Sequence, residues 1–204
     1  KIGYLRLLRA LGALDLDFTG VEAIIKQDVA LSVKLLRYLN SAAFASRRKI
    51  ESIRQALTLL GERKVRQWAS LIAVTQLASD RPTELAITAL VRARFCEQLG
   101  PLARLPSSRQ MDLCLTGMLS VVDAMIGRPI DEVLDDLSVG GEVREAIVHR
   151  AGTIGAIYAL ALAYERADWG RLSVLADELR VSGETIPAAY RSAVVWANDV
   201  LGLL

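Results

Sequence analysis

Few side chains in this 204-residue sequence could carry acid–base chemistry. The one histidine, His149, stands near the end of a helical pattern, where the helix dipole favours a surface imidazole over a ligand or a base. Asp135 and Asp136 are adjacent and would point about 100° apart on a helix, which is typical of a solvated acidic face. We therefore expect no catalytic residue.

Metal and nucleotide chemistry find little support in the residue pattern. Cys96 and Cys114 lie 18 positions apart in apolar helical patterns without companion histidines, so we expect buried, reduced thiols and no zinc site. Glycine-rich phosphate loops and a GxSxG elbow do not occur, and nothing local supports a Ser–His–Asp triad. We expect no metal and no cofactor.

Charge gives no sign of a nucleic-acid partner. The net charge is +2, from 25 basic and 23 acidic residues that alternate along most of the chain, so a general affinity for polyanions is not indicated. The sequence contains 52% hydrophobic residues, with five prolines and 14 glycines, which favours a helical fold with a sizeable core.

Two helix-period segments between Asp28 and Gly61 organise the chain. The first spans about 29–39, and the second spans about 52–60 and is ended by Gly61, which tolerates a positive φ. The link between them contains Arg47, Arg48 and Lys49. This basic cluster is either a loop that docks an anion or a partner, or a solvated turn.

The rest of the chain is also read as helices. A single helix is expected over 110–126, and the charge-free run of 14 residues over 151–164 is too short to span a bilayer. No strand pattern or fixed repeat is found, so we predict an all-α fold of about ten helices in one bundle. The link near Leu105 divides the single domain, 1–204, into subregions of about 1–105 and 106–204.

No signal peptide is predicted at the amino terminus, where the first residues form an amphipathic pattern. The sequence starts at Lys1 rather than Met, so we expect a piece of a longer protein. Reduced cysteines and the lack of a membrane span favour a cytoplasmic location.

Three stretches together resemble a known family. They read QD-x-ALS-x-KLL-R-x-LNSA, then I-x-SI-x-QA-x-x-LLG, then LVRARFCEQLG from Leu90. This order resembles the HDOD domain, the non-catalytic relative of the HD and HD-GYP metal-dependent phosphohydrolases of bacteria. The resemblance continues from about Leu5 to about Leu201, and its later stretches look most like the variant that follows an EAL-type domain. It implies an HD-superfamily-like helical bundle.

The resemblance also identifies a degenerate metal pocket. Where the catalytic family reads GLLHDIG, residues 117–123 place Ser120 and Val121 at the metal-binding His and Asp. Asp123 would point about 200° away from Val121 on a continuous helix, so it is not a replacement ligand. Arg92 stands about where another metal-binding histidine occurs, and we hypothesise that its guanidinium fills the pocket.

Arg92 and Arg94 diverge by about 200° on one helix, so at most one faces the interior. An interior arginine must find a carboxylate, because an unpaired buried charge is costly. The remaining residues shared with the family signature are read as structural, and Trp68 among them needs an acceptor for its indole N–H. These residues are Asn40, Ser41, Gln55, Gly61 and Trp68.

The function implied is that of a non-catalytic regulatory domain in bacterial signal transduction. It would bind a protein partner or a neighbouring EAL-type domain, with a link to cyclic di-GMP signalling, no nucleic acid and no membrane, and a homo-oligomer is compatible with it. The alternative is a residual metal-dependent HD-type phosphohydrolase or a nucleotide-binding domain. Direct DNA binding is a third candidate, and it predicts an affinity that falls steeply with salt.

Overall fold

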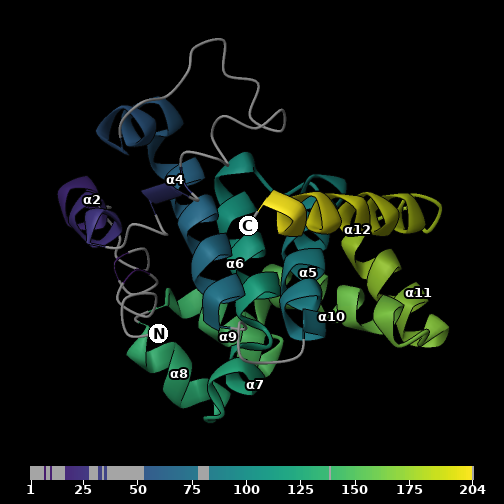
Figure 1. The fold of residues 1–204 in the computed structure, drawn as a ribbon. Coiled ribbons are helices and arrows are strands. Elements are labelled where there is room, and N and C mark those ends of the chain that lie inside the picture. The colour runs from purple at the N-terminus through teal and green to yellow at the C-terminus, as the bar shows by residue number, and fades with distance from the viewer. Residues whose placement is uncertain are drawn as a thin grey trace.

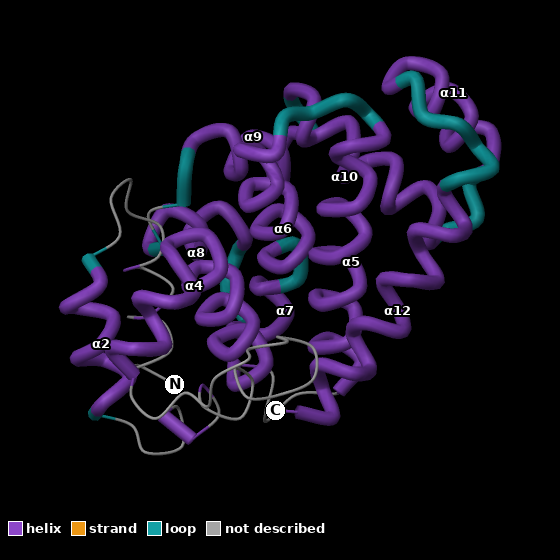
Figure 2. Tube along the Cα trace, turned by 90° about the horizontal axis from the view of Figure 1, so that it is seen from above, coloured by secondary structure: helices purple, strands orange, loops and turns teal. Residues whose placement is uncertain are grey.

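The structure is a computed structural model of the 204-residue chain. It describes residues 7, 10, 17–27, 32, 33, 35, 53–77, 83–137 and 139–203. In these residues the regular structure is helical throughout and contains no strand, as Figures 1 and 2 show, so the predicted all-α class with about ten helices is confirmed. The helices are α2 (Phe18–Lys26), α4 (Ile53–Leu77), α5 (Thr83–Leu102), the 3₁₀ turn η2 (Ser107–Arg109), α6 (Gln110–Leu119), α7 (Val122–Ile126), α8 (Ile130–Asp136), α9 (Gly141–His149), α10 (Gly152–Glu165), α11 (Trp169–Leu179) and α12 (Ile186–Leu203).

The helix α5 lies at the centre of the bundle. It packs against α6, α10 and α12, while α6 also contacts α4 and α9. Figure 2 shows α5 and α6 running side by side between α4 and α12, with α2 and α11 at opposite outer edges. A residue on the inner face of α5 can therefore reach the ends of α6 and α10.

The helix α4 belongs to two hydrophobic clusters. Val65, Trp68 and Ile72, on one face, pack with α2. Leu71 and Val74 lie on another face and join the larger cluster built around α5, α6, α10 and α12. This follows from helical periodicity, because residues three and four apart share a face while their neighbours turn away from it.

Gly61 produces a kink within α4. Its φ of 70° and ψ of 164° are not helical, and the helix resumes on its far side. The predicted end of the 52–60 helix therefore coincides with this break, and Gly61 does adopt the positive φ that glycine tolerates. Glycine suits this position because a side chain in the left-handed region is strained.

The predicted single helix over 110–126 is wrong, because the structure contains two helices there. Helix α6 ends at Leu119 and α7 begins at Val122. The hydroxyl of Ser120 donates to the carbonyl of Gly117, and Val121 leaves the helical region at φ −129° and ψ 14°. A serine that bonds to a nearby backbone carbonyl offers the chain an alternative to the helix, and β-branched Val121 has a restricted side chain.

The division near Leu105 stays a prediction. Helices α5 and α6, which lie before and after Leu105, pack against each other and contribute to the same hydrophobic cluster.

One stretch, Gly141–Glu165, is long and apolar enough to cross a membrane by length and composition, with a mean hydropathy of 1.4. This is weak evidence, since 61% of it is buried inside the fold and buried core helices pass the same test. The stretch is also broken in the middle, because Arg150 adopts a left-handed φ of 59° between α9 and α10.

The two cysteines are free and buried, as expected. Burial raises the pKa of the Cys96 thiol to about 12, and burial likewise raises the pKa of Cys114 well above its ordinary range.

Because the thiolate is the reactive form, we predict that neither thiol reacts with a water-soluble disulfide reagent at pH 8 in the folded protein. Both should react once guanidinium chloride unfolds the chain. Rapid release of chromophore from the folded protein would contradict this.

Candidate functional site

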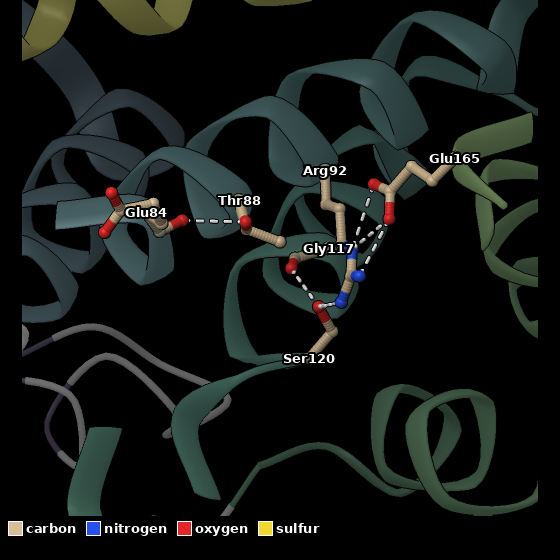
Figure 3. A network of polar contacts seen from close by, with 6 residues as sticks. All are labelled: Glu84, Thr88, Arg92, Gly117, Ser120 and Glu165. Atoms are coloured by element: carbon tan, nitrogen blue, oxygen red, sulfur yellow. Dashed lines mark hydrogen bonds and ion pairs between the residues drawn. The ribbon is translucent and has the colours of Figure 1, made fainter. Parts of the chain in front are cut away.

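A polar network centred on Arg92 joins helices α5, α6 and α10. Its guanidinium extends from α5 toward the end of α10, where Nε lies 3.0 Å from Oε1 and Nη2 lies 2.7 Å from Oε2 of Glu165 (Figure 3). The Arg92 and Glu165 side chains are only 15% and 16% exposed. Two parallel N–H···O bonds between charged groups, largely shielded from water, form one of the stronger polar contacts available to a protein.

Ser120 completes the network. Nη1 of Arg92 donates to Oγ of Ser120 at 3.1 Å, and this hydroxyl in turn donates to the Gly117 carbonyl at 2.7 Å (Figure 3). The guanidinium is thereby tied to α10 on one side and to the end of α6 on the other. Both hydrogen-bonding roles of the hydroxyl are used within the protein.

Gly117 allows α6 to approach α5 closely at this point. A Cβ atom on Gly117 would lie 2.4 Å from the backbone carbon and oxygen of Arg92. Both obstacles are backbone atoms, so no side chain can rotate away to make room. The missing side chain of Gly117 therefore determines how near Ser120 comes to the guanidinium.

Arg94 takes a different environment from Arg92. Its side chain is 33% exposed, and it pairs with Glu97 on the same helix while its guanidinium lies 5.7 Å from the Trp196 ring. Arg92 is thus the more buried of the two, and it does contact a carboxylate.

Burial and the charge of Glu165 act on the pKa of Arg92 in opposite directions. Burial disfavours the charged guanidinium, but the hydrogen bonds and charge of Glu165 outweigh it and raise the pKa of Arg92. The pKa of Tyr190 is raised, first by burial and then by Glu165. Tyr190 also contacts Phe95 and Tyr164, with ring centroids 5.2 Å and 4.9 Å away. An aromatic cluster therefore borders the ion pair.

These residues have little capacity to hold a metal. A guanidinium has no lone pair to offer, and the Ser120 hydroxyl is engaged on both sides. Across the part of the chain that the structure describes, no three His, Cys, Asp or Glu side chains are grouped closely enough to hold an ion. What the network can do is fix the mutual position of α5, α6 and α10.

The structure thus brings two of the three predicted pocket residues, Arg92 and Ser120, into direct contact. Val121 is half-buried and packs against the hydrophobic core instead. The geometric argument about Asp123 is wrong in its premise, because the helix break at 120–121 places Val121 and Asp123 on no common helix. Whether these positions form a degenerate metal pocket stays a hypothesis.

Glu165 is the residue that sequence reasoning missed. It follows Arg92 by 73 positions, and no spacing rule links the two. The available signal was a single carboxylate at the end of an otherwise apolar helix, in ALALAYER. Such a residue is a candidate partner for any interior cation on a neighbouring helix.

The other predicted site residues are dispersed. Trp68 is fully buried in α4, but its indole N–H has no acceptor among the described residues. Gln55 is exposed on the same helix, and His149 is exposed at the last turn of α9. Five predicted residues lie outside the described part of the chain and receive no structural account: Asn40, Ser41, Arg47, Arg48 and Lys49.

Asp135 and Asp136 are both exposed, as expected for a solvated face. They pair separately, Asp135 with Arg144 and Asp136 with Arg128. They do not form a paired-carboxylate site.

Comparison with known proteins supports a specific family. A family model described as "HDOD domain" matches residues 3–127. A protein of Vibrio cholerae named "Cyclic di-GMP phosphodiesterase CdgJ" is 32% identical over 98% of this chain and 46% of its own length. The protein YuxH of Bacillus subtilis is 29% identical over 97% of this chain and 48% of its own length. The chain therefore spans about half the length of these curated relatives.

A crystal structure from Marinobacter aquaeolei VT8, described in terms of signal transduction, shares the fold. It covers 100% of this chain and 58% of its own, with a TM-score of 0.65 and 13% identity. At this identity the likeness supports the fold alone.

The prediction that this protein is not an enzyme is contradicted by the comparisons. A relative that matches nearly all of this chain is named a phosphodiesterase. The prediction relied on the side chains that occupy one pocket. The side chains at one pocket do not exclude an active site elsewhere in a longer protein. The prediction was wrong because it extended a statement about this pocket to the protein.

Breaking the Arg92–Glu165 pair should destabilise the fold. Glu165→Gln leaves a largely buried guanidinium without its counter-charge, so we expect a loss of about 2–4 kcal/mol in the free energy of unfolding. Arg92→Gln should cost a similar amount, and the double variant less than the sum of the two, because neither charge is then left alone. Denaturant unfolding measures all three. The control is Glu132→Gln in the exposed pair with Arg128, with an expected change of under about 0.5 kcal/mol. Strictly additive losses would contradict the coupling.

Adding a methyl group at Gly117 should also be costly. Gly117→Ala forces α6 away from the Arg92 backbone, and we expect about 1–3 kcal/mol of destabilisation from this overpacking. Gly202→Ala is the matched control, since nothing lies within 4 Å of its added Cβ and alanine favours a helix. Equal unfolding midpoints for the two variants would show that the close approach at Gly117 is unimportant.

Proposed function

The chain belongs to the HDOD family, and on this premise we propose that it is the regulatory part of a bacterial enzyme of cyclic di-GMP turnover. In this proposal the remainder of the full-length protein is an EAL-type domain that hydrolyses cyclic di-GMP. The 204 residues described above would dock on that domain and set its rate. The protein would act in the cytoplasm.

The extent of the matches supports this division of labour. The relative named as a phosphodiesterase matches almost all of this chain but only 46% of its own length, so more than half of that protein has no counterpart here. There is room in it for a separate domain. The family match and the named activity are then compatible within one protein.

The contact between Arg92 and Glu165 is the observation that carries the proposal. It joins α5 to α10 through a shielded ion pair, and Ser120 extends it to α6. The ion pair and the hydrogen bonds hold the three helices in fixed positions. A fold held in this way presents the same surface to a partner before and after binding. We propose that the degenerate metal pocket has this structural role.

The partner in this proposal is the neighbouring EAL-type domain of the same protein. Self-association and the lack of nucleic-acid and membrane partners stay predictions. Among the described residues, large apolar side chains are exposed on α11 and α12, with Trp169 at 60% and Val195 at 59%. Exposed apolar groups of this size are compatible with a docking surface.

The test is a cyclic di-GMP hydrolysis assay on the full-length protein. Deleting the residues of this chain should change the rate several-fold while leaving measurable hydrolysis, because a regulatory part adjusts an active site that lies elsewhere. Val195→Asp, which replaces an exposed apolar side chain of α12 by a charge, should shift the rate in the same direction as the deletion. Glu132→Gln, far from this surface in sequence and already exposed, serves as the control.

Two outcomes would overturn the proposal. One is hydrolysis that is unchanged by the deletion, since then nothing is regulated. The other is hydrolysis by the 204-residue chain alone that is abolished by Arg92→Gln or Ser120→Ala, since this would place the chemistry at the network itself.

A further inference from the structure

A cavity of about 100 Å³ lies where α10 ends and α11 begins, and three arginines line it. We propose that this cavity binds a phosphate group, either as inorganic phosphate or as the terminal group of a phosphate monoester. The residues that would form the site are Arg150, Arg166 and Arg171, together with Asp168. In Figure 2, α11 lies at the outer edge of the bundle, on the far side from α2, so the site is remote from α2.

The charge around the cavity is strongly unbalanced. Three arginines and one aspartate are among the residues that line it, so the lining residues carry an excess of two positive charges. Within the described part of the chain, no carboxylate lies in ion-pair distance of any of the three arginines. Arg109 and Arg128, by contrast, are held by Glu142 and Asp136. The cavity thus concentrates positive charge that the protein itself does not neutralise.

Arg150 is held in place at the corner between α9 and α10. Its guanidinium lies 4.4 Å from the centroid of the Tyr158 ring, a cation–π contact that restricts its motion. Its backbone has a φ of 59°, and the corner is tight because a Cβ on Gly155 would lie 2.3 Å from the Arg150 carbonyl carbon. A guanidinium already ordered by the protein loses less entropy when it binds an anion.

The start of α11 adds to the attraction for an anion. Asp168 caps this helix by accepting a hydrogen bond from the backbone N–H of Arg171 at 3.1 Å. The N-terminal end of a helix carries partial positive charge. The Asp168 carboxylate opposes an incoming anion, so its charge lowers the affinity of the site without abolishing it.

The size and chemistry of the site favour phosphate. A cavity of about 100 Å³ that is open to solvent has room for one tetrahedral oxyanion, while the rest of a phosphate monoester would extend outside it. Guanidinium groups donate paired N–H bonds that match the spacing of phosphate oxygens. A phosphate monoester carries a charge of about −1.5 to −2 at pH 7. A phosphodiester carries one, so the excess of positive charge favours the monoester.

Calorimetric titration of the full 204-residue chain with inorganic phosphate, phenyl phosphate and cyclic di-GMP tests the proposal. We expect the first two to bind and the cyclic diester to bind at least about tenfold more weakly. Arg166→Gln and Arg171→Gln should each weaken phosphate binding about tenfold, as for the loss of one charge-assisted hydrogen bond. Arg191→Gln, an exposed arginine on α12, is the matched control and should leave the affinity unchanged. Thermal melts should show that all variants are folded.

A change of opposite sign sharpens the test. Asp168→Asn removes the opposing charge but keeps a residue that caps helices well, so phosphate should bind several-fold more tightly. Tighter binding of phenyl phosphate than of inorganic phosphate would identify the monoester as the source, and equal binding would identify the free ion.

The proposal is overturned if neither phosphate binds, if the cyclic diester binds as tightly as the monoester, or if Arg166→Gln behaves like Arg191→Gln. Because the probes are simple phosphates and the readout is binding, its failure is distinguishable from a failure of the proposed regulatory function.

Discussion

A cation in the interior of a helical bundle is the constraint on which this structure depends. Arg92 projects from the central helix, where water cannot solvate its charge fully, and the fold must supply a counter-charge. Glu165 supplies it from the far end of α10, and Ser120 accepts a hydrogen bond from Nη1. The positions of three helices are thereby linked through one planar group. Apolar packing alone would tolerate small shifts between these helices, whereas two parallel hydrogen bonds tolerate very little.

The backbone contact at Gly117 and the helix break after it serve the same junction. Without a side chain at Gly117, α6 lies directly against the Arg92 backbone. The chain then leaves the helix at Ser120, which turns the hydroxyl toward both the guanidinium and the Gly117 carbonyl. A continuous helix would have placed Val121 and Asp123 on the same helix and would have surrounded both residues with different side chains. The interruption is therefore part of how the site is built.

Helical periodicity was enough to predict the fold class, the end of a helical segment at Gly61 and the burial of both cysteines. Electrostatics was enough to predict that an interior arginine needs a carboxylate. The identity of that carboxylate could not be predicted, because Glu165 and Arg92 are 73 positions apart and meet only through tertiary packing. The break at Ser120 was also missed, since its cause is a local hydrogen bond that competes with an otherwise strong apolar pattern. The conclusion about enzymatic activity failed for another reason, because it extended a statement about one pocket to a whole protein.

The two-sided burial of α4 has a consequence for how the molecule loses its structure. One face of this helix completes the cluster with α2, and the other completes the larger cluster around α5. If either cluster came apart by itself, α4 would expose a row of apolar side chains while still being held by the other. That intermediate is unfavourable, so the two cores are expected to melt together as one cooperative unit.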